Sequence, residues 1–122
     1  MKGNAVCTIL HQYYDTASET TRFAPFYLGG VHWQERCGLD PKTGGVESTD
    51  SLRVYLVSPH YLPPEGWQKG SAGWTVAPGD RILRGAVTDY EHHLRAAYTV
   101  TGAVYHDYGT KTASHWAITG VR

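Results

Sequence analysis

The sequence predicts an all-β protein, a small single-domain β-barrel or sandwich with one short helix and long loops. Short segments rich in strand-forming residues recur along the chain, and residues typical of turns separate them. The stretch from Gly73 to Gly85 joins two such segments through a Pro-Gly-Asp turn. Nine tyrosines and four tryptophans, against two phenylalanines, supply rings that fill a thin core while keeping a polar tip hydrated. Many short strands of this kind are typical of sandwiches and barrels.

The length and charge of the chain restrict its organisation and its partners. A chain of 122 residues without internal repeats or linkers predicts one domain, residues 1–122, around one core. Eleven basic residues balance eleven acidic ones, so the overall attraction of a general nucleic-acid binder is missing and only a local basic patch remains open. The N-terminal residues fit neither a signal peptide nor a membrane span. We expect a soluble protein that is made in the cytoplasm.

The first half of the chain predicts two strands and a loop. Residues 5–14 alternate along a first strand, and the polar run 15–21 is typical of a hairpin turn. Residues typical of strands resume over 23–34, where the Gly29-Gly30 pair predicts a bulge or a sharp bend. The glycines and proline of residues 37–45 predict an exposed, mobile loop without regular structure over most of its length.

The next strand has the clearest alternation in the chain. Over residues 50–57, one face carries Leu52, Val54 and Leu56, and we expect this face to meet the core. A long loop over 58–74 follows, in which the prolines and glycine of residues 63–66 predict a single helical turn.

The rest of the chain returns to strands, with one helix between them. The strands are predicted over residues 75–76, 81–87, 98–105 and 115–121. Near 89–97, Thr88 and Glu91 have the spacing of a capping box, and Tyr90, Leu94 and Ala97 share one side at helical steps. We expect a helix of about two to three turns that packs across one end of the barrel.

Residues that carry chemistry form no recognisable catalytic motif. Seven histidines are a surplus, yet none lies in a metal-ligand pattern; a metal site would need His106, Asp107 and His115 to converge. Cys7 and Cys37 lie outside any CxxC spacing, so a disulfide stays undecided, and we expect reduced structural thiols. No nucleophile elbow or phosphate-binding glycine loop occurs. The sequence predicts no catalytic residue and no cofactor.

Several short motifs follow one another along most of the chain. They are Gly30-Val31-His32-Trp33, the strand from Arg53 to Pro59, Pro63-Pro64-Glu65-Gly66-Trp67, Gly79-Asp80-Arg81-Ile82-Leu83-Arg84-Gly85, Tyr98-Thr99-Val100 and His115-Trp116-Ala117-Ile118-Thr119-Gly120. Their order resembles that of the small head-closure proteins of long-tailed bacteriophages, also called stoppers or head-to-tail joining proteins, and of a related group of small uncharacterised phage and prophage proteins. The loop at 40–45 and the insertion at 59–73 do not match a stopper's channel loop residue by residue.

The resemblance implies a non-enzymatic structural subunit of the virion, assembled in the host cytoplasm. Such subunits form a homo-oligomeric ring below the portal or adaptor, later receive the tail proteins, and keep packaged DNA from leaking. Packaged DNA would pass through the channel without sequence-specific binding, and no membrane is involved. A neutral net charge is compatible with a channel through which DNA slides. The resemblance leaves open the ring order, which face meets head or tail, and whether the subunit is a stopper or an adjacent tail-completion protein.

The residues singled out so far divide into fold determinants and candidate contacts. The expected fold determinants are Trp33, Gly79, Asp80, Ile82, Gly85 and Trp116. The candidate partner contacts are Tyr61, Trp67 and Trp74 in one loop and Tyr108 and Lys111 in the last loop. The alternative for these rings is that they close the open end of their own barrel.

Two rival functions remain open at this point. One is a small β-sandwich that binds sugars or peptides on exposed, coplanar Trp and Tyr rings. The other is a metal-dependent enzyme built on His106, Asp107 and His115, which requires a bound metal and a pocket.

Overall fold

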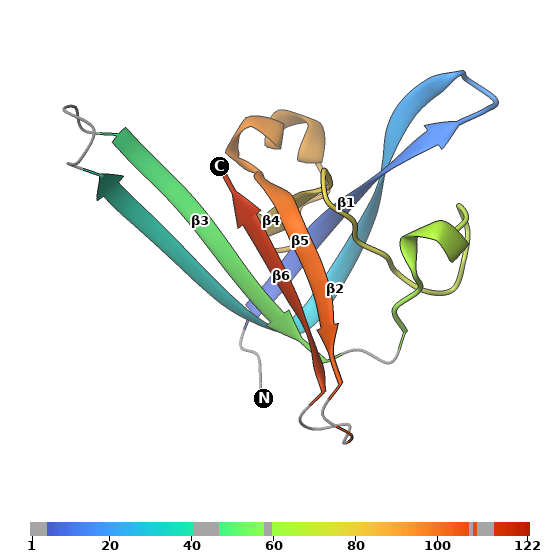
Figure 1. Cartoon of the computed structure of the whole chain (residues 1–122). Coiled ribbons are helices and arrows are strands. Elements are labelled where there is room, and N and C mark those ends of the chain that lie inside the picture. The colour runs from blue at the N-terminus through green and yellow to red at the C-terminus, as the bar shows by residue number, and fades with distance from the viewer. Residues whose placement is uncertain (1–4, 41–46, 58–59, 108, 110–113) are drawn as a thin grey trace.

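In a computed structural model of the chain, six antiparallel strands close into a barrel (Figure 1). The structure describes residues 5–40, 47–57, 60–107, 109 and 114–122, with the backbone alone at 37–40 and 47–49. Around the barrel the strands are β1 (Ala5–Asp15), β2 (Thr20–Asp40), β3 (Glu47–Leu56), β6 (His115–Val121), β5 (Tyr98–His106) and β4 (Arg81–Arg84). The predicted all-β, single-domain fold is confirmed.

The long strand β2 pairs with two neighbouring strands, one after the other along its length. Its first part pairs with β1 and its second part with β3, and Figure 1 shows the two resulting hairpins extending in different directions. At Gly29-Gly30 the register against β1 shifts, and Gly30 has φ +66°, a conformation that favours glycine. The predicted bulge is therefore confirmed.

The loop predicted over 37–45 was wrong in its first residues. β2 continues to Asp40, which pairs with Glu47 at the start of β3. Glycine at position 38 is tolerated because pairing with a neighbouring strand supplies the backbone hydrogen bonds. Residues 41–45 lie outside the described residues.

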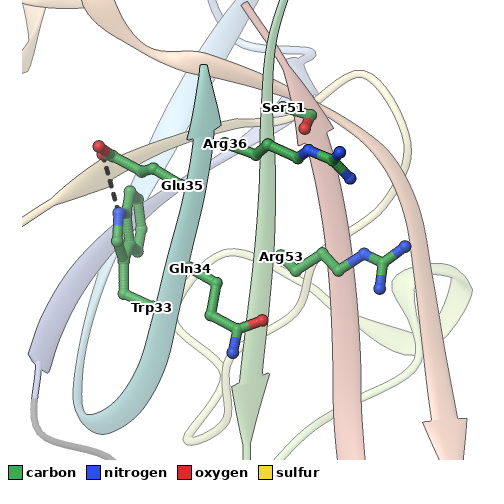
Figure 2. Close-up of a pocket in the computed structure, with 6 residues that line it drawn as sticks. All are labelled: Trp33, Gln34, Glu35, Arg36, Ser51 and Arg53. Atoms are coloured by element: carbon green, nitrogen blue, oxygen red, sulfur yellow. Dashed lines mark hydrogen bonds between the residues drawn. The ribbon is translucent and has the colours of Figure 1, made fainter. Parts of the chain in front are cut away.

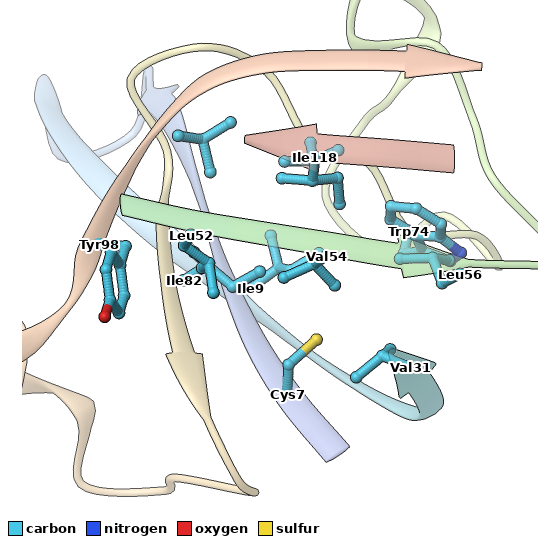
Figure 3. Close-up of a cluster of buried hydrophobic side chains, with 12 residues drawn as sticks. Cys7, Ile9, Val31, Leu52, Val54, Leu56, Trp74, Ile82, Tyr98 and Ile118 are labelled. Atoms are coloured by element: carbon cyan, nitrogen blue, oxygen red, sulfur yellow. The ribbon is translucent and has the colours of Figure 1, made fainter. Parts of the chain in front are cut away.

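The core fills the barrel with alternate side chains of its strands (Figure 3). The predicted core face of β3 is confirmed, since Leu52, Val54 and Leu56 are all buried. The remaining members of this core cluster are Cys7, Ile9, Val31, Trp74, Val76, Ile82, Tyr98, Val100 and Ile118. A second cluster of Leu10, Leu83 and Ala97 lies apart from the first, so β1 is buried on both of its faces.

The single helix predicted near 89–97 is instead two successive turns of 3₁₀ helix, η3 (Tyr90–His92) and η4 (Leu94–Ala96). The N-cap residue of η3 is Asp89, whose side chain makes no capping hydrogen bond, so the expected capping box does not form. Tyr90 and Leu94 nevertheless pack against the second cluster. The segment covers Leu10 of β1 and Leu83 of β4, on the side away from the core residues Ile9 and Ile82, without the regular hydrogen bonding of an α-helix.

Two predicted strand segments also differ from the structure. Thr75 and Val76 are buried but belong to no strand. They lie in the segment before the turn that leads into β4, and the side chain of Val76 packs in the core. Strand β4 ends at Arg84 instead of Val87, since Gly85 takes φ +86° and leaves the extended conformation. The helical turn predicted in the long loop is confirmed as η2 (Pro64–Gly66).

Candidate functional site

The Pro-Gly-Asp turn before β4 is held by the buried carboxylate of Asp80. Its Oδ2 lies 2.8 Å from Nδ1 of His11 and accepts a 2.8 Å hydrogen bond from the backbone N–H of Ala77. Its Oδ1 accepts a 3.0 Å hydrogen bond from the N–H of Gln12. Asp80 is 2% exposed and His11 is 7% exposed. This carboxylate therefore ties β1 to the turn, in agreement with an architectural role.

Glycines on either side of β4 have backbone roles of the same kind. Gly79 has φ +97° and donates its N–H to the carbonyl of Val100 on β5. Gly85 donates its N–H to the carbonyl of Val6 on β1, and its own carbonyl accepts the hydroxyl of Thr8. Between these two glycines, Ile82 is fully buried in the core. Together these contacts fix both ends of the shortest strand.

Aromatic rings gather around Trp116 near one end of the barrel. The ring centroid of Tyr61 lies 3.6 Å from that of Trp116, and those of Tyr105 and Trp74 lie 5.0 and 6.3 Å away. Trp74 is 5% exposed and belongs to the core, so it is not available to a partner. Burial raises the pKa of the Tyr61 phenol. These rings pack on one another within the molecule, and a partner contact at the partly exposed Tyr61 stays a prediction.

The other two tryptophans also pack within the molecule. Trp33 meets the ring of Tyr98 edge-on and donates its indole N–H to the carboxylate of Glu35 at 2.9 Å. Trp67 makes edge contacts with His11, Tyr13 and Phe26 at centroid distances of 4.9 to 5.6 Å. The described ring pairs of all four tryptophans are tilted or edge-on, so these rings form no coplanar stacking platform. The two contacts predicted in the last loop, Tyr108 and Lys111, lie outside the described residues.

A metal site would need His106, Asp107 and His115 to converge, and only the two histidines lie together. His106 and His115 are cross-strand partners on β5 and β6, with ring centroids 5.1 Å apart. The Asp107 carboxylate instead accepts hydrogen bonds from the N–H of Gly109 at 2.9 Å and the hydroxyl of Ser114 at 3.2 Å. Among the described residues, no group of three potential ligands is arranged to hold a metal ion.

Sequence reasoning missed a depression that is lined by residues of β2 and β3. It has a volume of about 570 Å³ and is lined by Trp33, Gln34, Glu35, Arg36, Ser51 and Arg53. Figure 2 shows Arg36 and Arg53 extending to one side of the sheet, while Trp33 and Glu35 extend to the other. We call the outward set, Gln34, Arg36, Ser51 and Arg53, the arginine face. The alternation that identified the core face of β3 also places Ser51 and Arg53 on the outside.

Comparison with known proteins identifies one family. The model of a family described as "Family of unknown function (DUF6751)" matches residues 1–121 of the chain. No curated protein and no solved structure matches the chain. In the part of the chain that the structure describes, no helix is long and apolar enough to span a membrane.

Proposed function

This chain belongs to the DUF6751 family of unknown function, and we propose that it is a structural subunit of a tailed-phage virion. In this proposal it is a head-completion, or stopper, protein. Copies of the chain form a ring below the portal or adaptor, and this ring joins the tail. The ring assembles in the host cytoplasm, and packaged DNA passes through its channel.

The observation that carries the proposal is the distribution of apolar side chains. The barrel interior is filled by the buried side chains of the core cluster. Large apolar side chains with 42% to 62% exposure stand on the outside of the described structure: Val6, Tyr14, Tyr27, Val57, Val104, Tyr105 and Val121. Exposed apolar groups of this kind mark protein contact surfaces when they cluster. In a ring of subunits, neighbouring copies or partner proteins would cover these exposed apolar side chains.

The sequence supplies two further supports. The order of short motifs, from Gly30-Val31-His32-Trp33 to the final His115–Gly120 segment, resembles that of head-closure proteins. The zero formal net charge agrees with a channel that does not trap DNA.

The test is deletion of the gene from the phage or prophage that encodes it. Lysates of the induced deletion strain are then imaged by negative-stain electron microscopy. We expect emptied or DNA-leaking heads beside free, finished tails, with joined virions restored when the gene is supplied in trans. Normal joined virions in the deletion strain overturn the proposal and favour a small ligand-binding module.

A further inference from the structure

The arginine face is built on two paired strands of the barrel, β2 and β3. Gln34 pairs with Arg53 and Arg36 pairs with Ser51 across β2 and β3. The two arginines are therefore diagonal neighbours on one surface, and diagonal neighbours in antiparallel sheets have their Cα atoms about 7 to 8 Å apart. Opposite them, Leu52 and Val54 are buried in the core, which fixes the outward direction of the arginines.

The charge of this face is not neutralised within the described structure. Arg36 and Arg53 are exposed and make no ion pair with any described residue. Two described carboxylates next in sequence to the arginine face, Glu35 and Asp50, are engaged with other groups. Glu35 accepts the indole N–H of Trp33 on the opposite side of the sheet, and Asp50 forms an ion pair with Arg122 at 3.0 Å. Two guanidinium groups are thus left side by side facing solvent.

The same outer surface continues across the neighbouring strand without a carboxylate among its described side chains. Arg53 pairs with Thr119 on β6, whose hydroxyl lies 3.1 Å from that of Thr101 on β5. On β2, His32 follows the same alternation and its Nε2 lies 2.9 Å from the amide nitrogen of Gln34. Hydroxyl, amide, imidazole and guanidinium groups are the side chains that contact phosphate and sugar in complexes with nucleic acids.

We propose that the arginine face binds the sugar–phosphate backbone of double-stranded DNA. Each guanidinium donates paired hydrogen bonds to phosphate oxygens, and the hydroxyl of Ser51 and the amide of Gln34 donate beside them. Contacts with the backbone carry no sequence information, so the binding is independent of sequence. Two phosphate contacts per chain give weak binding. A ring of several chains binds the same DNA more tightly because its contacts act together, although each single contact still exchanges rapidly.

This inference rests on the proposed function in one respect, because it assigns the face to the DNA that passes the ring. It also reconciles that role with the neutral net charge of the chain. The arginine face carries two of the eleven basic residues of the chain, so its positive charge is a local one. The chain attracts DNA on one side and does not attract it overall.

The test is titration of the isotopically labelled full chain with a short DNA duplex, followed by NMR at low salt. We expect the largest shift changes at Gln34, Arg36, Ser51 and Arg53 and small ones at Arg84 and Arg95. The double variant R36Q/R53Q is expected to bind about tenfold more weakly, and the slope of log K against log salt is expected to fall by about 1.8, or about 0.9 for each lost phosphate contact. All positions changed are exposed, so the variant keeps its fold.

The matched control is R84Q/R95Q, which removes the same charge from exposed arginines elsewhere. It is expected to keep the affinity and the salt dependence of the natural chain. No shift changes with DNA, or equal weakening by both double variants, overturns the inference. If R36Q/R53Q also blocks head-to-tail joining without any effect on DNA binding, the face contacts an acidic protein neighbour instead. Failure of DNA binding leaves the connector proposal intact, because gene deletion tests that proposal separately.

Discussion

At the level of single residues, the Asp80 carboxylate joins the turn before β4 to β1. It is buried and serves three groups, the imidazole of His11 and the N–H groups of Gln12 and Ala77. Asp80→Ala removes the acceptor of the two backbone N–H groups and leaves the buried His11 imidazole without its partner. We expect the free energy of unfolding to fall by about 2 to 4 kcal/mol.

Urea unfolding monitored by fluorescence measures this loss. The matched control is Asp89→Ala, because the Asp89 side chain is 62% exposed and its ion-pair partner His93 is also exposed. The control is expected to change stability by less than about 0.5 kcal/mol. Equal effects of the two substitutions would show that the Asp80 contacts do not stabilise the turn.

The thiol of Cys7 makes stability depend on alkaline pH. Burial raises its pKa from 9.0 to about 12 in the folded chain. Above pH 9 the unfolded chain releases this proton while the folded chain keeps it, so unfolding becomes more favourable between pH 9 and 12. The free energy of unfolding is expected to fall by about 1.4 kcal/mol for each pH unit in this window.

Urea unfolding across this pH range is compared between Cys37→Ser and Cys7→Ala/Cys37→Ser. Both chains share every other titrating group, so the difference between their pH slopes isolates Cys7. Parallel pH profiles would contradict the prediction. In the folded Cys37→Ser chain, the free and fully buried Cys7 is also expected to resist thiol reagents at neutral pH.

At the level of elements, the long loop depends on a close approach at Gly73. The segment at Tyr61 bridges to Trp74 in parallel, and a Cβ at Gly73 would lie 2.5 Å from the carbonyl oxygen of His60 and 2.7 Å from Cγ of Leu62. Gly73→Ala must therefore displace backbone. We expect it to detach the loop and lower stability by about 1 to 3 kcal/mol.

Limited proteolysis of the folded chain, followed by mass spectrometry, measures this detachment. Gly66→Ala is the matched control, since nothing lies within 4 Å of a Cβ built there and its φ is not in the left-handed region. Cleavage between residues 60 and 74 is expected to accelerate in Gly73→Ala and to stay unchanged in Gly66→Ala. The same cleavage rate in both variants would exclude the packing role of Gly73.

Elements with strong local signals were predictable from sequence. The alternation in β3, the bulge at Gly29-Gly30 and the turn at Pro64–Gly66 follow from side-chain period, glycine freedom and proline geometry. The segment at 88–97 was not predictable, because its helical spacing is local whereas its packing on Leu10 and Leu83 is not. Thr75 and Val76 have the residue types of a strand because they are buried, but buried residues need not belong to a strand.

The candidate site was predictable to a smaller extent. Aromatic residues in a long loop suggested contacts with a partner, but Tyr61 and Trp74 pack on Trp116 across sequence distances that composition does not reveal. The arginine face requires the register of β2 against β3, which places Arg36 beside Ser51 and Gln34 beside Arg53. Alternation alone indicates the direction of one strand's side chains and not which residues lie next to them.

At the level of the whole molecule, exposed apolar side chains on a closed barrel predict association that depends on a partner. We expect the isolated chain to be monomeric or weakly associated by size-exclusion chromatography with light scattering, and to be incorporated into rings on the portal or adaptor. Val104→Asp, at a position 54% exposed on β5, is expected to preserve stability within about 0.5 kcal/mol and to abolish joining of heads and tails in complementation of the deletion.

Thr21→Asp, at an exposed position on β2, introduces the same charge without removing an apolar group. It is expected to support joining. If Val104→Asp also supports joining, the exposed part of β5 is not a contact with a neighbour. If both substitutions block joining, the added charge and not the lost apolar group is responsible.

The shortest strand also sets how the barrel responds to a mechanical load. Strand β4 pairs with β5 through Arg81 with Thr99 and Ile82 with Tyr98, whereas β1 and β2 pair along the whole of β1. Tension applied across a closed ring of strands is borne by every seam in series, and the seam with the fewest hydrogen bonds parts first. Tension across this barrel is therefore resisted beside this seam by the Asp80 turn, whose hydrogen bonds to β1 and β5 reinforce the barrel.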